Sequence, residues 1–278
     1  MKKKLLIPLS ILGLVSCLKP VSTTIVSVDT ETGTKQAKQV KESSTIQLAE
    51  GLTIDLWATD SLAPDPVAMS IDDAGRIYIT RTNRQKNSEF DIRGHRDWMT
   101  PSIALQSVED RRAFLRDVST KVYEGPNEEV TDVIGGILVR QKDAFVTTGP
   151  DMLRLKDKNN DGFYESSESI NHGYAVHIGF SGHGMSGATE GPDGKIYWQI
   201  GDIGANITDK SGKKHEYPNE GILVRSNPDG SDFEVVTKGI RNTHEFVFDE
   251  YGNIISSDND GDHPGESERL VHLVEGGD

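Results

Sequence analysis

Short alternating runs of apolar and polar residues recur along the chain, each directly after a glycine-containing turn. Glycine accepts the left-handed backbone that such turns need, and alternation of β-branched and aromatic residues is typical of a strand. An apolar strand also precedes each turn, so every copy has the form of the inner hairpin of a propeller blade. Copies lie in residues 72–79, 191–198 and 249–255, with a less regular one in 133–148. Internal repeats of this kind are typical of β-propellers.

The repeats predict an all-β domain over residues 46–278, made of consecutive antiparallel four-stranded sheets arranged radially, with no parallel βαβ unit. The pattern accounts for about four blades. Because too few blades would leave two strand edges exposed, we expect this chain to be the front portion of a longer protein. A complete four-bladed propeller is the alternative. One helix is predicted from Ser107, where Ser107–Asp110 resembles a capping box, as an insertion on one face.

The first 17 residues have the pattern of a bacterial lipoprotein signal. Lysines at 2–4 precede the apolar run Leu5–Val15, which is too short to span a bilayer because a spanning helix needs about 20 residues. The run ends in Leu-Val-Ser-Cys, which resembles a lipobox, and Cys17 is the only cysteine. We therefore expect lipidation at Cys17 and a periplasm-facing position in the bacterial cell envelope, anchored to the membrane; a buried apolar cysteine is the alternative.

Composition adds one interpretation, for residues 18–45, and two exclusions. The stretch 18–45 is rich in Thr, Ser, Val, Lys and Gln with no lasting period, and is interpreted as a flexible tether between lipid and domain. The net charge of −14 argues against nucleic acid, because phosphate binding needs a basic face. With one cysteine, the chain can form no internal disulfide.

The candidate chemistry centres on His183, which lies eight residues before the turn at Gly191. A neutral imidazole can take a proton from a hydroxyl group near neutral pH. The alternative is a loop histidine bonded only to backbone. His177 is the competing candidate, but it lacks the Ser186-Gly187 sequence that follows His183.

Residues 183–202 resemble the soluble quinoprotein glucose dehydrogenases and the related aldose-sugar and sorbosone dehydrogenases, which are six-bladed β-propellers. The shared motif is a histidine followed by x-x-Ser-Gly, then Gly-Pro-Asp-x-Lys-Ile-Tyr and a strand that ends in Gly-Asp. The resemblance implies that His183 is the catalytic base, that Asp202 orients it, and that hydride passes from a sugar or other alcohol to pyrroloquinoline quinone (PQQ). A cytochrome is an implied electron acceptor, and a Cys-x-x-Cys-His motif further along a full-length chain would supply a haem.

Two further segments match the same family. Gly239-Ile240-Arg241-Asn242 corresponds to its Gly-x-Arg-Asn, although Thr243 stands where the family has proline. The resemblance implies that Arg241 and Asn242 contact the cofactor and that Arg241 steadies a developing oxyanion. Residues 257–266 correspond to a Ser-Glu-Gln-Gly-Pro segment whose carbonyls hold calcium. This chain departs from that pattern with an acidic insertion, so Asp258 and Asp260 would bind a metal through carboxylates instead.

A second, independent metal signal lies in residues 157–168. Oxygen-bearing side chains occupy positions 1, 3, 5, 9 and 12 of a calcium-loop pattern, with glycine at position 6: Asp157, Asn159, Asp161, Glu165, Glu168 and Gly162. The flanking residues 152–155 have the pattern of a strand and not of a helix. We interpret the loop as a Ca²⁺-stabilised connection within a blade; a solvated turn without an ion is the alternative.

The leading hypothesis is therefore a PQQ-dependent dehydrogenase of sugars or other alcohols. Two alternatives remain open. One is a glycan-binding propeller without catalysis, which should expose aromatic side chains such as Trp57, Trp98 or Trp198. The other is a calcium-dependent lactone hydrolase, in which Asp258 and Asp260 would help to hold a water-activating metal.

Overall fold

The computed structural model describes residues 27–81, 92–118, 135–179, 182–259 and 263–278. The chain divides into two compact units, Met1–Leu62 and Ala63–Asp278. Cys17 and the signal-like segment lie outside the described residues. In the described part of the chain, no helix is both long enough and apolar enough to cross a membrane.

The described part of the first unit, residues 27–62, contains one helix, α1 (Thr30–Ser43). Asp29 caps it, because its Oδ1 accepts a hydrogen bond of 2.9 Å from the Thr32 amide. The expectation that this stretch has no regular structure was wrong for residues 30–43. Its Lys, Gln and Ala residues are good helix formers, and Lys38 lies 3.9 Å from Glu42 one turn later. The helix buries no residue, and its sequence has too few apolar side chains to form a stripe that a pattern could reveal.

The second unit is built from antiparallel strands throughout its described part, as predicted. The described residues form five sheets. In hydrogen-bonding order they are β1–β2, β3–β4–β5–β6, β12–β11–β8–β7, β10–β9 and β13–β14–β15. The strands are β1 (Pro66–Ile71), β2 (Ile77–Arg81), β3 (Gly136–Arg140), β4 (Asp143–Thr148), β5 (Asp151–Lys156), β6 (Ser166–His172), β7 (Met185–Glu190), β8 (Ile196–Ile200), β9 (Ala205–Thr208), β10 (Lys214–Tyr217), β11 (Gly221–Ser226), β12 (Glu234–Ile240), β13 (Thr243–Phe248), β14 (Ile254–Asp258) and β15 (Arg269–Leu273).

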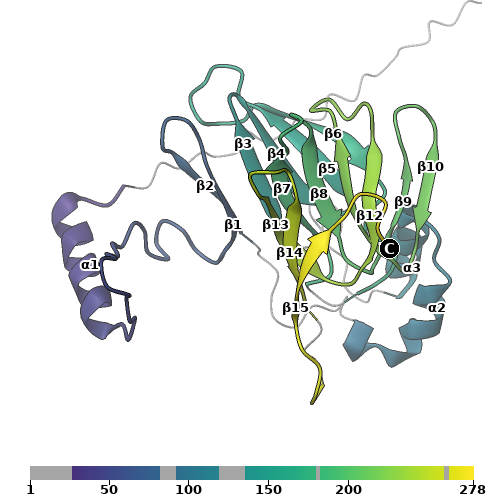
Figure 1. Ribbon diagram of the computed structural model, residues 1–278, viewed down its shortest axis with the longest axis horizontal. Coiled ribbons are helices and arrows are strands. Elements are labelled where there is room, and N and C mark those ends of the chain that lie inside the picture. The colour runs from purple at the N-terminus through teal and green to yellow at the C-terminus, as the bar shows by residue number, and fades with distance from the viewer. Residues whose placement is uncertain (1–26, 82–91, 119–134, 180–181, 260–262) are drawn as a thin grey trace, which may run out of the picture. The chain divides into compact units, whose positions relative to one another are not determined.

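The sheets follow one another as successive blades (Figure 1). The first strand of each sheet lies against the first strand of the next: β1 against β3, β3 against β7, and β7 against β13. Gly136 permits one of these approaches, since a Cβ there would lie 2.8 Å from the Gly187 carbonyl carbon. Two sheets have the expected four strands, while β13–β15 has three and β1–β2 has two. The all-β, propeller-type prediction is confirmed, with β9–β10 as an extra hairpin inside the third blade.

The repeated turn sets the hairpins. Gly75, Gly194 and Gly252 have φ of +76°, +77° and +84°, in the left-handed region that glycine favours. The same turn also occurs at 209–212 and 227–230, where Gly212 and Gly230 have φ of +87° and +83°. These two copies were not predicted. The 209–212 turn belongs to the extra β9–β10 hairpin, whose strands have only four residues each.

We number the blades along the chain: β1–β2 is the first, β3–β6 the second, the sheet of β7, β8, β11 and β12 the third, and β13–β15 the fourth. The main core lies between the second and third blades. Every residue of β8 is buried, as expected for a strand covered on both faces. Trp198 of β8 packs with Phe145, Met152 and Tyr174, all fully buried. A second cluster, with Tyr197, Leu223 and Phe246, joins the third blade to the fourth. Burying such large side chains contributes about 1.5–3 kcal/mol each, which holds neighbouring blades in fixed positions.

Helices lie at one edge of the sheets (Figure 1). They are the short helices η1 (Ile92–Gly94), η2 (Arg96–Trp98) and α2 (Met99–Ile103), and the longer α3 (Val108–Val118). The predicted cap is confirmed, since Ser107 Oγ accepts a 3.1 Å hydrogen bond from the Asp110 amide. The Asp110 carboxylate accepts from the Gln106 amide and thus completes the cap one residue earlier than a standard capping box would.

Candidate functional site

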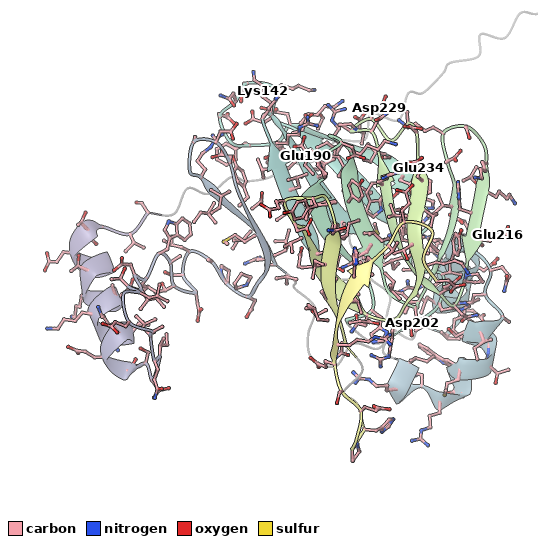
Figure 2. All side chains as sticks on the ribbon, in the orientation of Figure 1. Lys142, Glu190, Asp202, Glu216, Asp229 and Glu234 are labelled. Atoms are coloured by element: carbon pink, nitrogen blue, oxygen red, sulfur yellow. The ribbon has the colours of Figure 1, made fainter. Side chains whose placement is uncertain are left out.

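The β7–β8 pairing brings His183 and Asp202 together. Met185 of β7 pairs with Ile200 of β8, and the same antiparallel register, extended two residues, places His183 opposite Asp202. His183 Nδ1 lies 2.6 Å from Asp202 Oδ1. Figure 2 shows Asp202 at the edge of the sheets that carries α2 and α3, opposite to Lys142 and Asp229. The motif spacing in the sequence therefore corresponds to a direct side-chain contact.

The hydrogen bond fixes the tautomer of His183. A carboxylate only accepts hydrogen bonds, so Nδ1 carries the proton and Nε2 is the basic nitrogen of the neutral ring. The imidazole is buried, with 3% of the residue exposed, whereas the Asp202 side chain is 42% exposed. A buried imidazole held by a carboxylate is arranged to accept a proton and to be stabilised afterwards as imidazolium.

Gly201 brings Arg241 to the same place. A Cβ at Gly201 would lie 2.7 Å from the Arg241 carbonyl oxygen and 2.8 Å from that of His183, so both backbones pass where only glycine fits. The Asp202 amide also donates a 2.9 Å hydrogen bond to the Arg241 carbonyl. Residues far apart in the sequence thus converge at the end of β8, as the hypothesis of a shared site requires.

The Asp258-Asn259 segment holds the loop that carries Arg241. Nη1 of Arg241 donates to the Asn259 carbonyl at 2.6 Å and to Asn259 Oδ1 at 3.1 Å. Asp258 Oδ1 accepts a 2.8 Å hydrogen bond from the Asn242 amide, and Asp258 Oδ2 lies 2.8 Å from Arg269 Nη2. The Asp258 carboxylate, predicted as a metal ligand, is therefore engaged by protein groups. Asp260 lies outside the described residues.

His183, Asp202 and Arg241 line one pocket of about 260 Å³. Its polar lining consists of Ser102, His177, His183, Asp202, Asn219 and Arg241, and its apolar lining includes Ile92, Met99, Ile103, Ile178 and Ile203. Asn242, predicted beside Arg241, is buried next to the pocket and is not part of this lining. The contributions of α2 and of Asn219 were not predicted, because no motif marks them.

The acidic loop between β5 and β6 gathers part of the predicted calcium set. Single oxygens of Asp157, Asp161 and Glu165 lie within 4.8 Å of one another, the one carboxylate or histidine group of this kind in the described residues. Asp157 accepts hydrogen bonds from the Asn160 amide (2.5 Å) and the Gly162 amide (2.8 Å). Burial raises the pKa of Asp157, but these amides outweigh it, so the pKa is lowered and the carboxylate stays charged.

The two other predicted ligands of this loop behave differently. Asn159 Oδ1 accepts from the Asp161 amide, and its Nδ2 donates to the Asp161 carboxylate, so it borders the cluster. Glu168 lies in β6 and pairs with Lys156 at 2.8 Å. Because strand pairing with β5 begins before position 12 of the loop, Glu168 lies outside the carboxylate cluster. The calcium-loop pattern thus includes one residue, Glu168, that does not lie with the other carboxylates.

Residues 38–273 match the model of a domain family of unknown function, DUF7133, and the chain belongs to this family. Among solved structures it is similar to the PQQ-bound aldose sugar dehydrogenase of Streptomyces coelicolor, at 14% identity and a TM-score of 0.44, over 76% of this chain and 60% of that one. It is also similar to a putative glucose dehydrogenase of Thermus thermophilus, at 14% identity and a TM-score of 0.43, over 76% of this chain and 62% of that one. The chain thus spans about three fifths of the length of these structures. No curated protein matches it.

Proposed function

We propose that the pocket at the end of β8 binds a hydroxyl group of a sugar or other alcohol, and that His183 takes the hydroxyl proton while the alcohol is oxidised. The observation that carries this proposal is the 2.6 Å contact between His183 and Asp202 in a pocket that Arg241 also lines. Base, orienting carboxylate and cation are the groups that removal of a proton from an alcohol requires.

Each residue has its own role in the proposed oxidation of the alcohol. The hydroxyl O–H bond breaks, and its proton moves to Nε2 of His183. Asp202 stabilises the resulting imidazolium through Nδ1, as its contact allows. The carbon–oxygen double bond forms as the hydrogen on the same carbon leaves with its electron pair to an acceptor. The Arg241 guanidinium, fixed by Asn259, stabilises negative charge on the substrate oxygen before the hydride departs.

PQQ is the acceptor we propose, and when bound it would supply the site that takes the hydride. The donor set of the pocket fits its quinone oxygens, because Arg241 presents a planar cationic group there. PQQ is a tricarboxylate, and Arg241 is the one cation among the described lining residues. The described residues would therefore hold the quinone end. A cytochrome is the proposed onward electron acceptor.

Two accompanying proposals concern other parts of the chain. We infer that Ca²⁺ binds the loop at Asp157, Asp161 and Glu165 and stabilises the β5–β6 hairpin. We also infer that the protein is lipid-anchored at Cys17 in the cell envelope and faces the periplasm. The first rests on the carboxylate cluster and the second on the signal-like pattern of the sequence.

The alternatives have less support. A glycan-binding surface needs exposed aromatic rings. Of the three tryptophans, Trp98 and Trp198 are buried, and Trp57, which is 66% exposed, lies in the first unit and not in the propeller-type unit. A metal-dependent hydrolase would use Asp258, whose carboxylate is already paired with Arg269 and with the Asn242 amide. Glycan binding without catalysis does not explain why a carboxylate orients a histidine in the pocket.

The test compares two histidines that each contact an aspartate. His183→Ala in the full-length protein, supplied with PQQ and calcium, should lower dye-linked oxidation of sugars by about 10²-fold or more. His172→Ala removes a histidine whose Nδ1 lies 2.9 Å from Asp151, outside the pocket, and should leave activity near that of the wild type. An equal loss of oxidation activity in both variants, or full activity in His183→Ala, would contradict the proposal.

A further inference from the structure

A second histidine in the pocket has a role that proton transfer by His183 does not explain. His177 lines the same pocket, and 6% of the residue is exposed. Its Nδ1 lies 2.5 Å from the carbonyl oxygen of Ser102 in α2. Ser102 Oγ also accepts a 3.0 Å hydrogen bond from the Ile178 amide. The ring is therefore held between α2 and the backbone that leads toward His183.

The contact with Ser102 fixes the tautomer of this ring as well. A carbonyl oxygen only accepts, so Nδ1 of His177 carries the proton and donates it. Burial is the largest effect and lowers the pKa of His177. The hydrogen bond to the Ser102 carbonyl opposes it in part, and the charge of Arg111 lowers the pKa by a smaller amount. The ring is thus neutral at neutral pH, and its Nε2 is an acceptor with a lone pair.

Nε2 of His177 is buried without a hydrogen-bond partner among the described residues. Leaving a buried polar atom unpaired costs about 1–3 kcal/mol, so such atoms are rare and need an explanation. An acceptor can be satisfied by a ligand that brings a hydrogen-bond donor. A metal ion is not favoured, since no group of three potential ligands in the described residues includes His177.

We propose that Nε2 of His177 accepts a hydrogen bond from a second hydroxyl of the ligand, so that the pocket selects polyhydroxylated molecules over simple alcohols. The inference rests on the proposed function in one respect, that the pocket binds a hydroxyl compound. His183 serves the hydroxyl that reacts, and His177 serves one that does not. A ligand without this second hydroxyl leaves the buried nitrogen unpaired, and sites of this kind reject such analogues strongly.

Two substitutions distinguish the hydrogen bond that His177 donates to Ser102 from the hydrogen bond that it is proposed to accept from the ligand. Asparagine can place its amide nitrogen where Nδ1 lies, so His177→Asn retains a donor for the Ser102 carbonyl and loses the acceptor for the ligand. Glutamine can place its amide oxygen where Nε2 lies, so His177→Gln retains the acceptor and loses the donor. A purely structural role of His177 predicts that His177→Asn behaves like the wild type in binding.

The experiment measures dissociation constants of D-glucose and each of its monodeoxy analogues by NMR titration of the full-length protein labelled with ¹⁵N-histidine. In the wild type, at least one analogue should bind about tenfold or more weakly than D-glucose, and D-glucose should shift the His177 Nε2 resonance. In His177→Asn the difference between that analogue and D-glucose should shrink to about twofold or less, whereas His177→Gln should keep most of it.

The outcomes distinguish this inference from the proposed function. Discrimination that disappears in His177→Asn, without any oxidation of glucose, supports the inference and overturns the dehydrogenase proposal. Oxidation with equal discrimination in the wild type and His177→Asn overturns the inference and leaves the dehydrogenase proposal intact. Absence of binding by all these sugars, or a proton on Nε2 of His177 in the unliganded protein, overturns the inference.

Discussion

A carboxylate beside an imidazole changes what the ring can do. The described residues contain three such pairs, those of His172, His183 and His215, and the first two lie in very different surroundings. In the pocket, Asp202 holds a buried His183. At the contact between α3 and the second blade, His172 lies between Asp151 (2.9 Å) and Glu109 (3.2 Å) with its side chain 41% exposed. The same residue types thus form a candidate proton acceptor in one place and an ion pair in the other.

The His172 pair predicts a pH dependence of stability. The hydrogen bond with Asp151, and the charges of Asp151 and Glu109, raise the pKa of His172 above its ordinary 6.5. A raised folded-state pKa means that the stabilisation is fully present below about pH 6.5 and is lost as the pH rises through the folded pKa. His172→Asn cannot carry the charge but can still donate to Asp151. Its melting temperature should fall below that of the wild type by about 1–3 °C near pH 5.5 and match it near pH 9.

The control for this prediction is His95→Asn. The His95 ring stacks on Trp98 and forms no ion pair with a carboxylate within the described residues, so this variant measures the loss of an imidazole that has no carboxylate partner there. A His172→Asn difference that is constant across the pH range would show that the pair adds packing and no charge interaction.

At the scale of elements, the hairpin is the unit that carries both candidate sites. The register of β7–β8 places His183 opposite Asp202, and the β5–β6 connection gathers the carboxylates of the acidic loop. Each site lies where a strand ends, because the strand register fixes the side chains and the loop leaves room for a ligand.

The acidic loop gives the prediction at this scale. With Ca²⁺ at about a hundredfold excess over its Kd, the melting temperature should rise by about 5–10 °C, and a chelator should reverse the rise. Asp161→Ala and Glu165→Gln should each remove most of the shift. Glu168→Gln, which alters a carboxylate of the same hairpin paired with Lys156, should keep it.

Asp157 is less suitable for this test, because its carboxylate also holds the amides of Asn160 and Gly162 and its loss would destabilise the loop without any metal. A melting curve that calcium leaves unchanged in the wild type would identify the loop as an ordinary turn. A shift that Glu168→Gln abolishes would contradict the geometry described for β6.

At the scale of the whole molecule, blades packed side by side place distant residues in one pocket. The successive first strands β3, β7 and β13 lie against one another, and β13 follows directly after the loop of Arg241 and Asn242. Convergence of His183 and Arg241 is therefore a property of the blade order. No single motif could show it.

The sequence predicted those features that local patterns determine. Alternation and turn glycines identified the strands. The motif that contains His183 and Asp202 also predicted that these two residues act together, and their side chains are in direct contact. It could not predict the parts that depend on packing. These include the position of α2 over the pocket, the unpaired Nε2 of His177, and the pairing of Glu168 with Lys156. The helix α1 was missed because it buries nothing and has no periodic stripe.

The proposed lipid anchor is a property of the whole molecule that depends on one residue outside the described part. Cells grown with labelled palmitate should yield labelled wild-type protein, and Cys17→Ser should carry no label and leave the membrane fraction. The double variant Cys17→Ser, Met152→Cys restores one cysteine in the core and should also carry no label, which controls for labelling of any cysteine. Equal labelling of the wild type and Cys17→Ser would contradict the anchor.

The most direct test of the central claim is the kcat of Asp202→Asn, because this change keeps the shape of the pair and removes the charge that stabilises a protonated His183. With full-length protein, PQQ, calcium and D-glucose, we predict a fall in kcat of about 10²-fold or more with little change in KM. The matched variant Asp151→Asn alters the His172 pair in the same way outside the pocket and should retain its kcat. Wild-type kcat in Asp202→Asn, or an equal fall in both variants, would contradict the account.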